Sequence, residues 1–273
     1  MQSVVRSYQE VIKTIHELHR NNPVAMSEMG MVEAGPIRYP VYKIHIKGQS
    51  KGNPRPPSVF IAAGIHGDEP GGVWAALEFL KRCPTLPSFY GQFEFTVLPC
   101  TNPYGYEHNT RENAQGLDLN RQFRETHPPK EVQLVREVAR DEAYSLAMEF
   151  HEDVDTPGFY LYELTQEGEF SWGKEMIARV AGRFPINLNS EIEGLPAEGG
   201  LIFRKPSDTP VHQMIERRSS WPQAFYHFAN GTRHCFTTET PISLTRSERV
   251  EIHLMALDVA LQKLWEQQPP HRP

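Results

Sequence analysis

The chain has few cysteines, no long apolar run and no excess of positive charge. Only three of its 273 residues are cysteine, and Cys83, Cys100 and Cys235 lie far apart. This spacing offers neither a paired disulfide framework nor a Cys-x-x-Cys zinc ribbon, and it favours reduced thiols buried as small apolar side chains. Because a chain of this length can also build a large hydrophobic core, a disulfide-stabilised miniprotein is excluded.

The other absences limit the partners and the compartment. No apolar run approaches the roughly 18 residues that a membrane-spanning helix requires, so we expect no membrane insertion. Lys and Arg number 28 against 34 Asp and Glu, with no local basic stretch, so nucleic acid is not an expected partner. The amino terminus lacks the apolar segment and cleavage site of a secretory signal, and we therefore expect a cytoplasmic protein.

Hydrophobic periodicity alternates between strand and helix along most of the chain. Strands are predicted over residues 41–47, 59–65, 93–98, 145–150, 159–164, 201–204 and 234–238, and helices over 4–18, 72–81, 130–141, 172–184 and 246–265. This order predicts an α/β fold with a mixed, mostly parallel central sheet and helices on both faces. No linker, repeat or low-complexity tract interrupts it, so we expect a single domain over residues 1–273.

One motif of serine hydrolases occurs in an unsuitable context. The segment Gly48-Gln49-Ser50-Lys51-Gly52 matches the G-x-S-x-G pattern, whose serine must lie on a turn that leads directly into a helix. Here the segment is followed by Asn53-Pro54, and a residue before proline is driven out of helical geometry. We therefore interpret Ser50 as part of a solvated hairpin loop.

A stronger signal lies at the ends of two predicted strands. The first strand leads into His66 and Glu69, and the second leads into His151, Glu152 and Asp153. In open α/β sheets, binding sites form at the carboxyl ends of the strands, and imidazole and carboxylate groups are typical zinc ligands. A single histidine at a strand end is also consistent with a hydrogen-bonded structural residue, and the two acidic neighbours with solvated side chains. Together they form a His, Glu, His set suited to an open zinc site.

The long polar loop between these strands contains further candidates. Residues 109–123 carry Arg111, Asp118, Asn120 and Arg121 without an amphipathic period. The segment is compatible with a plain surface loop. Because a planar guanidinium binds carboxylates in a bidentate manner, the two arginines instead favour recognition of an anion.

The ordered set of motifs resembles the zinc carboxypeptidase family, which includes carboxypeptidase A and the bacterial murein peptide amidases. The motifs are His66-x-x-Glu69, Asn102-Pro103 followed by Arg111, Asp118-Leu119-Asn120-Arg121, His151 and Glu239. The metal motif and the Asp-Leu-Asn-Arg segment are also similar to the succinylglutamate desuccinylase and aspartoacylase branch. The resemblance implies a carboxypeptidase-like fold and a zinc-dependent hydrolase.

The resemblance also implies a role for each matching residue. One Zn²⁺ per chain would be held by His66, Glu69 and His151. Asp118 would accept a hydrogen bond from the second ring nitrogen of His66 and fix its tautomer. Glu239 would be the general base for the water that zinc activates.

Two further groups would recognise the substrate. Arg111 would polarise the scissile carbonyl and stabilise its oxyanion, and Asn120 with Arg121 would bind a substrate carboxylate. The implied substrate is a small peptide or an N-acyl amino acid with a free carboxylate. Tyr226 is a candidate for the mobile-loop tyrosine of the digestive enzymes, and the specificity pocket is expected within Ser190–Arg233.

Three functions remain open at this point. The leading hypothesis is a metallocarboxypeptidase that hydrolyses a peptide or amide bond next to a free carboxylate. An N-acyl amino acid deacylase is the alternative, although that branch places its base sooner after the last histidine and adds a β-rich domain. A catalytically silent, metal-retaining binding protein is the third reading. The joint presence of Glu239, Arg111 and all three ligands argues against it.

Overall fold

The computed structural model describes residues 6–22, 24–48, 55–140, 142–166, 170–203 and 211–268, without the side chains of residues 211 and 212. Ser50 and the two prolines after the last predicted helix lie outside these residues. None of the described helices is long and apolar enough to cross a membrane.

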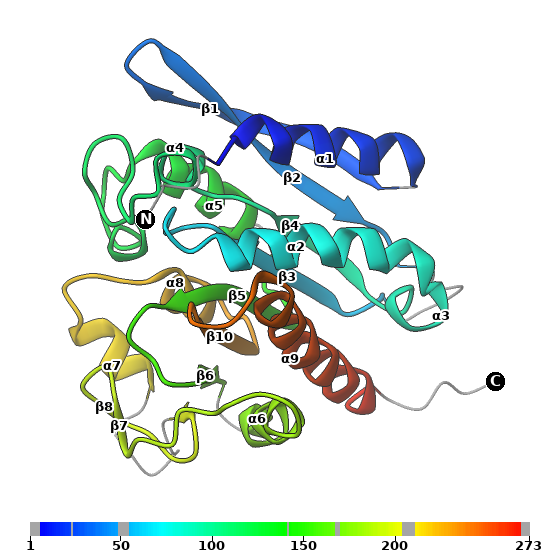
Figure 1. Ribbon diagram of the computed structural model, residues 1–273, viewed down its shortest axis with the longest axis vertical. Coiled ribbons are helices and arrows are strands. Elements are labelled where there is room, and N and C mark those ends of the chain that lie inside the picture. The colour runs from blue at the N-terminus through cyan, green and yellow to red at the C-terminus, as the bar shows by residue number, and fades with distance from the viewer. Residues whose placement is uncertain are drawn as a thin grey trace.

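An eight-stranded sheet forms the centre of the described chain (Figure 1), with the strand order β1-β2-β4-β3-β5-β10-β6-β9. The strands are β1 (Ala25–Ala34), β2 (Ile37–Ile46), β3 (Ser58–Ala63), β4 (Glu94–Leu98), β5 (Leu146–Asp153), β6 (Tyr160–Thr165), β9 (Leu201–Phe203) and β10 (His234–Pro241). The four central strands β4, β3, β5 and β10 are parallel, and so are β6 and the edge strand β9. The pairs β1–β2, β2–β4 and β6–β10 are antiparallel. A separate pair consists of β7 (Glu191–Ile192) and β8 (Leu195–Pro196). The expected mixed, mostly parallel sheet is confirmed.

Helices cover both faces of this sheet, as expected. They are α1 (Tyr8–Asn21), α2 (Pro70–Arg82), α3 (Pro87–Tyr90), α4 (Pro103–His108), α5 (Lys130–Arg140), α6 (Gly173–Ala181), α7 (Val211–Arg217), α8 (Gln223–Ala229) and α9 (Arg246–Glu266), with short 3-10 turns at Cys83–Thr85 and Leu119–Arg121. Helices α2, α6 and α9 share one apolar core with one face of the sheet, and α5 and α8 share a second core with the other face.

The strand β3 illustrates why its sequence is continuously apolar. Val59 and Ile61 belong to the core under α2 and α9, whereas Phe60 and Ala62 belong to the core under α5 and α8. A strand buried on both faces has no solvent side on which to place polar residues. The three cysteines are buried as free thiols, in agreement with their expected role as small apolar side chains.

Residues at the first positions of α2 and α9 explain where these helices begin. Helix α2 begins with Pro70, whose missing N–H is no loss at the first helical position. Helix α9 begins with a capping box, in which the Thr245 hydroxyl accepts a hydrogen bond from the Glu248 N–H while the Glu248 carboxylate accepts one from the Thr245 N–H. This cap fixes the start of α9, which packs against β5 and β10.

The structure adds one edge strand that the sequence does not predict. Strand β1 is largely exposed and contains a register irregularity between Glu28 and Gly30, where it pairs with β2. An exposed edge strand lacks the apolar alternation by which strands are recognised. The strand predicted over 201–204 is β9, which is described as far as Phe203.

Candidate active site

The loop after β3 is held against helix α4 by close backbone packing. A Cβ added at Gly67 would lie only 1.8 Å from the carbonyl carbon of Gly105, so no larger residue fits there. The fully buried Asn102 accepts a hydrogen bond from the Gly105 N–H at 2.9 Å and donates its amide protons to the carbonyls of Ile65 and Glu112. The Asn102 side chain therefore connects the His66 loop to the segment that carries Arg111.

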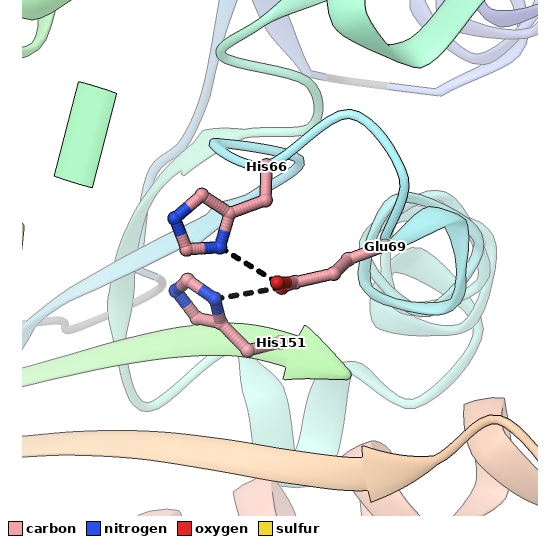
Figure 2. A group of neighbouring side chains, drawn as sticks. All are labelled: His66, Glu69 and His151. Carbon is pink, nitrogen blue, oxygen red and sulfur yellow. Dashed lines mark hydrogen bonds and ion pairs between the residues drawn. The ribbon is translucent and has the colours of Figure 1, made fainter. Parts of the chain in front are cut away.

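Three side chains converge at the carboxyl ends of β3 and β5 (Figure 2). His66 follows β3, Glu69 precedes helix α2, and His151 lies near the end of β5. The Nδ1 atom of His66 is 2.7 Å from Oε1 of Glu69, and the Nδ1 atom of His151 is 2.8 Å from Oε2. All three side chains are buried, and one donor atom of each lies within 4.8 Å of the others.

The charges within this group shift the pKa values of Glu69 and His151. Burial alone would raise the pKa of Glu69, but the two imidazoles outweigh it and hold the pKa well below its usual range. Burial would lower the pKa of His151, yet the Glu69 carboxylate and the nearby Glu149 raise it well above its ordinary value. The backbone N–H of Glu152 also donates to Oε2 of Glu69 at 3.2 Å. The carboxylate of Glu69 is thus oriented between both rings.

Asp118 and Arg111 lie on the solvent side of His66. Oδ1 of Asp118 is 3.2 Å from Nε2 of His66, the nitrogen that faces away from Glu69. Arg111 donates to Oδ2 of Asp118 at 3.1 Å and to Oε1 of Glu69 at 3.3 Å. Burial raises the pKa of Asp118, but the hydrogen bond with His66 and the charge of Arg111 outweigh it and hold the pKa well below its usual range.

Glu239 lies on β10, directly beside His151 on β5. The two residues are partners in the parallel register of these strands, so their side chains project from the same face of the sheet. Burial raises the pKa of Glu239 well above its usual range, and the charges of Glu69 and Asp153 add to this while His151 opposes it. A carboxyl group with a raised pKa accepts a proton more readily than an ordinary carboxylate does.

The acidic neighbours of His151 have other partners. The Glu152 side chain is completely buried, and its carboxylate accepts hydrogen bonds from the Gly71 N–H and from Arg249 of α9. Asp153 accepts a hydrogen bond from the Tyr160 hydroxyl at 2.9 Å. Glu152 therefore connects β5 to α2 and α9 and is shielded from solvent.

A cavity of about 740 Å³ joins the three converging side chains to the predicted substrate residues. Its walls include Arg111, Asn120 and Arg121 as well as Glu239. The Asn120 side chain is fixed, since its Oδ1 accepts a hydrogen bond from the Gln223 N–H at 2.8 Å. The structure thus brings the basic loop and the acidic strand end to the lining of one cavity.

The tyrosines of the cavity differ from the candidate chosen by sequence. Tyr226 lies on α8, buried against the ring of Phe123 and the guanidinium of Arg136, and does not belong to the described cavity lining. Tyr160 and Tyr162 of β6 line the cavity instead. Sequence periodicity does not show which face of the short helix α8 packs inward. The alternation along β6 places Tyr160 and Tyr162 on one face of the strand, and this face is assigned to the site once the pairing of β6 with β10 is known.

The region expected to form the specificity pocket contributes one wall of the same cavity. Leu195, Ile202 and Phe225 from Ser190–Arg233 line it, next to Tyr162. Glu193 adds a carboxylate at this wall. Described residues of the predicted region therefore line the same cavity as the candidate metal ligands.

The donor set fits a zinc ion. Two imidazole Nδ1 atoms and one carboxylate are the ligand types of catalytic zinc sites, which keep a further position open for water or substrate. His66, Glu69 and His151 present these atoms toward one another from two strand ends, and the second nitrogen of His66 contacts a carboxylate, as zinc-binding histidines commonly do. Of the described residues, this is the group of histidine, cysteine and acidic side chains with such geometry.

Comparisons with known proteins agree with this arrangement. The sequence profile of the zinc carboxypeptidase family matches residues 9–153, more than half of the chain. The matched region contains the three predicted metal ligands together with Arg111, Asp118, Asn120 and Arg121, whereas Glu239, Tyr226 and the expected pocket region lie outside it. No curated protein matches the chain.

Solved structures share the fold. A candidate metallopeptidase from Shewanella amazonensis is 22% identical with a TM-score of 0.76, over 94% of this chain and 93% of that one. A metallo-carboxypeptidase from Burkholderia cenocepacia is 18% identical with a TM-score of 0.67, over 95% and 70%. Carboxypeptidase A from Helicoverpa armigera is 14% identical with a TM-score of 0.69, over 96% and 74%. On the profile match, the chain belongs to the zinc carboxypeptidase family and is a zinc-dependent hydrolase of the metallopeptidase class.

Proposed function

We propose that the chain is a metallocarboxypeptidase that hydrolyses the peptide bond next to a free carboxylate and holds one zinc ion. The observation that carries this proposal is the shared cavity, which is lined by His66, Glu69 and His151 together with Glu239, Arg111, Asn120 and Arg121. A hydrolase of this kind needs a metal site, a proton carrier and an anion-binding group within reach of one scissile bond.

His66, Glu69 and His151 would hold the zinc ion. When bound, zinc polarises a carbonyl oxygen and lowers the pKa of water. Glu239 removes a proton from the attacking water as its oxygen bonds to the carbonyl carbon, and then delivers that proton to the leaving amine as the C–N bond breaks. Its burial and its register beside His151 support this role.

Arg111 and the following segment would bind and orient the substrate. Arg111 is partly exposed toward the cavity and carries the positive charge needed to stabilise a developing oxyanion. Asn120 is fixed by the Gln223 N–H, which leaves its amide nitrogen as a donor, and Arg121 adds a guanidinium suited to a planar carboxylate. These groups favour a substrate whose cleaved residue has a free carboxylate.

Three matched substrates test this proposal with the zinc-loaded protein. The first is a short peptide with a free carboxyl terminus, the second is the same peptide amidated, and the third is an N-acyl derivative of its last amino acid. Rapid release of the last residue from the first peptide alone is the expected result. Equal cleavage of the free and amidated peptides would refute recognition of the carboxylate, and faster cleavage of the N-acyl amino acid would identify a deacylase. Turnover of none of them would favour a metal-retaining binding protein.

A further inference from the structure

Glu149 is a buried carboxylate at the centre of the sheet. It lies on β5, two residues before His151, so both side chains project from the same face. Only 3% of Glu149 is exposed. A carboxylate at such a position loses its hydration on folding, and burial of an ion requires compensation by a charge or by hydrogen bonds.

The neighbours of Glu149 in the sheet supply no such compensation. Its register partners are Ala62 on β3, which has no polar side chain, and Thr237 on β10. Among the described residues, neither carboxylate oxygen of Glu149 has a hydrogen-bond partner. By contrast, the buried Glu163 on β6 accepts hydrogen bonds from the N–H groups of Trp172 and Gly173. The lack of partners at Glu149 therefore needs a specific explanation.

The Glu149 carboxylate faces the candidate metal ligand His151. Its Oε2 lies 3.8 Å from Nε2 of His151, beyond hydrogen-bond range but within the range of an ion pair. This nitrogen is on the opposite side of the ring from Nδ1, which faces Glu69. Glu149 is thus placed behind the ligand ring, away from the position where zinc would bind.

The two histidines show the same arrangement on both sides of Glu69. Each directs Nδ1 to that carboxylate, and each has a second carboxylate near Nε2, Asp118 for His66 and Glu149 for His151. Asp118 is also neutralised by Arg111, whereas no arginine or lysine contact is described for Glu149. Apart from the ring of His151 itself, a cation bound at Nδ1 of that ring would be the positive charge that balances Glu149.

We propose that Glu149 is a positioning residue that accepts a hydrogen bond from Nε2–H of His151 when zinc is bound at Nδ1. In this role it fixes the tautomer that leaves Nδ1 free to bind the metal, and it offsets part of the charge of the ion. The proposal requires the present 3.8 Å separation to shorten to hydrogen-bond range when the metal is bound. This inference rests on the proposed assignment of His151 as a zinc ligand.

Two substitutions separate the charge of Glu149 from its acceptor atoms. Glu149→Gln removes the charge and keeps one oxygen acceptor, and Glu149→Leu removes both. The matched control is Glu131→Gln, because Glu131 is an equally buried carboxylate on α5 that bonds to Asn113 and lies outside the described cavity lining. Zinc affinity of the full chain, measured by competition with a chromophoric chelator, is expected to fall about 10- to 100-fold for Glu149→Leu, less for Glu149→Gln, and less than twofold for the control.

Thermal unfolding of the metal-free proteins distinguishes positioning from a plain structural role. Because the substitutions remove a buried carboxylate that has no hydrogen-bond partner among the described residues, the metal-free variants should unfold at the wild-type temperature or higher, while the rise in unfolding temperature caused by added Zn²⁺ becomes smaller. Zinc affinity within twofold of wild type in Glu149→Leu overturns the proposal. So does a loss of zinc affinity that is matched by a loss of metal-free stability.

A parallel measurement on His151→Ala separates this inference from the proposed function. If wild-type protein binds no zinc, or if His151→Ala retains full zinc affinity, the proposed ligand set fails and the role of Glu149 fails with it. If His151→Ala loses zinc while both Glu149 variants bind it normally, the proposed function stands and the inference about Glu149 alone is wrong.

Discussion

Glu239 of β10 and His151 of β5 are register partners on adjacent parallel strands, and both lie at the carboxyl end of the sheet. Parallel pairing places their side chains on the same face, so the carboxylate proposed to carry the proton lies beside a candidate zinc ligand. Helix α9 and its capped start pack against β10 and β5 from the opposite face. The positions of Glu239 and His151 are therefore set by the central strands of the sheet.

The first prediction concerns the metal ligands. His66→Ala and His151→Ala should each lower zinc affinity sharply, because two protein ligands cannot replace three in an open zinc site. His108→Ala is the matched control, since His108 is exposed and stacks on Tyr104. Zinc content measured by atomic emission after dialysis tests this, and full occupancy in both site variants would show that other residues bind the metal.

Sequence patterns predicted the strand ends of the site because these follow from burial. The mainly apolar residues of β3 and β5 mark buried strands, and the polar residues near their carboxyl ends, His66 shortly after β3 and His151 near the end of β5, lie where sites form. Glu239 was assigned through family resemblance instead. Its place beside His151 depends on β10 being inserted next to β5, and sequence separation does not predict this pairing.

Other site residues depend on packing that a single sequence does not encode locally. Glu149 precedes His151 by two residues, and nothing in the sequence distinguishes it from a solvated carboxylate. Its burial and its missing hydrogen-bond partners among the described residues are visible only in the structure. Tyr226 is one residue of a short helix whose inward face is set by Phe123 and Arg136. The cavity tyrosines Tyr160 and Tyr162 are identified only once the pairing of β6 with β10 is known.

A second prediction concerns recognition of the substrate carboxylate. Arg121→Lys should raise KM for a free-carboxylate peptide by about tenfold and leave kcat nearly unchanged, because an ammonium cannot reproduce the paired hydrogen bonds of a guanidinium. Arg38→Lys, at an exposed arginine on β2, is the control. Steady-state kinetics measures both values. A normal KM in Arg121→Lys would place carboxylate recognition on other residues.

A third prediction concerns the buried ion pair of Glu152 and Arg249. Arg249→Met leaves the Glu152 carboxylate buried without its cation, and should lower the free energy of unfolding by about 3 kcal/mol. The double variant Glu152→Gln/Arg249→Met should recover part of this loss. Urea unfolding of the metal-free proteins provides the measurement.

Arg246→Met serves as the control for the Arg249 experiment. Arg246 and Arg249 both lie over the ring of Trp74, at 4.4 and 5.2 Å, but only Arg249 contacts Glu152 in the described structure. A loss of stability in Arg246→Met as large as that in Arg249→Met would attribute the effect to the stacking on Trp74, and would contradict the role of the ion pair.

A fourth prediction concerns pH and the buried His227. Burial lowers the pKa of His227 to about 3, from a value near 6.5 in an unfolded chain, and neither ring nitrogen has a hydrogen-bond partner among the described residues. Between these two values the unfolded state binds more protons than the folded state. His227 therefore lowers the free energy of unfolding by about 1.4 kcal/mol for each unit of falling pH in that window, and has no effect above it.

The variant His227→Leu tests the sign and the size of this effect. Its free energy of unfolding should fall less steeply than that of wild type between pH 6 and pH 4, whereas the exposed His108→Leu should retain the wild-type slope. Urea unfolding at several pH values gives both slopes. Equal slopes in His227→Leu and wild type would mean that His227 is not buried in its neutral form.

The proposed mechanism depends most directly on Glu239, which moves the proton and does not bind zinc. The decisive measurement is the turnover of a free-carboxylate peptide by zinc-loaded Glu239→Gln, with its zinc content determined on the same sample and with Glu191→Gln, at an exposed glutamate of β7, as control. We predict wild-type zinc content in both variants and a kcat lower by a factor of about 10²–10⁴ in Glu239→Gln alone. Wild-type turnover by fully loaded Glu239→Gln would contradict the proposed mechanism.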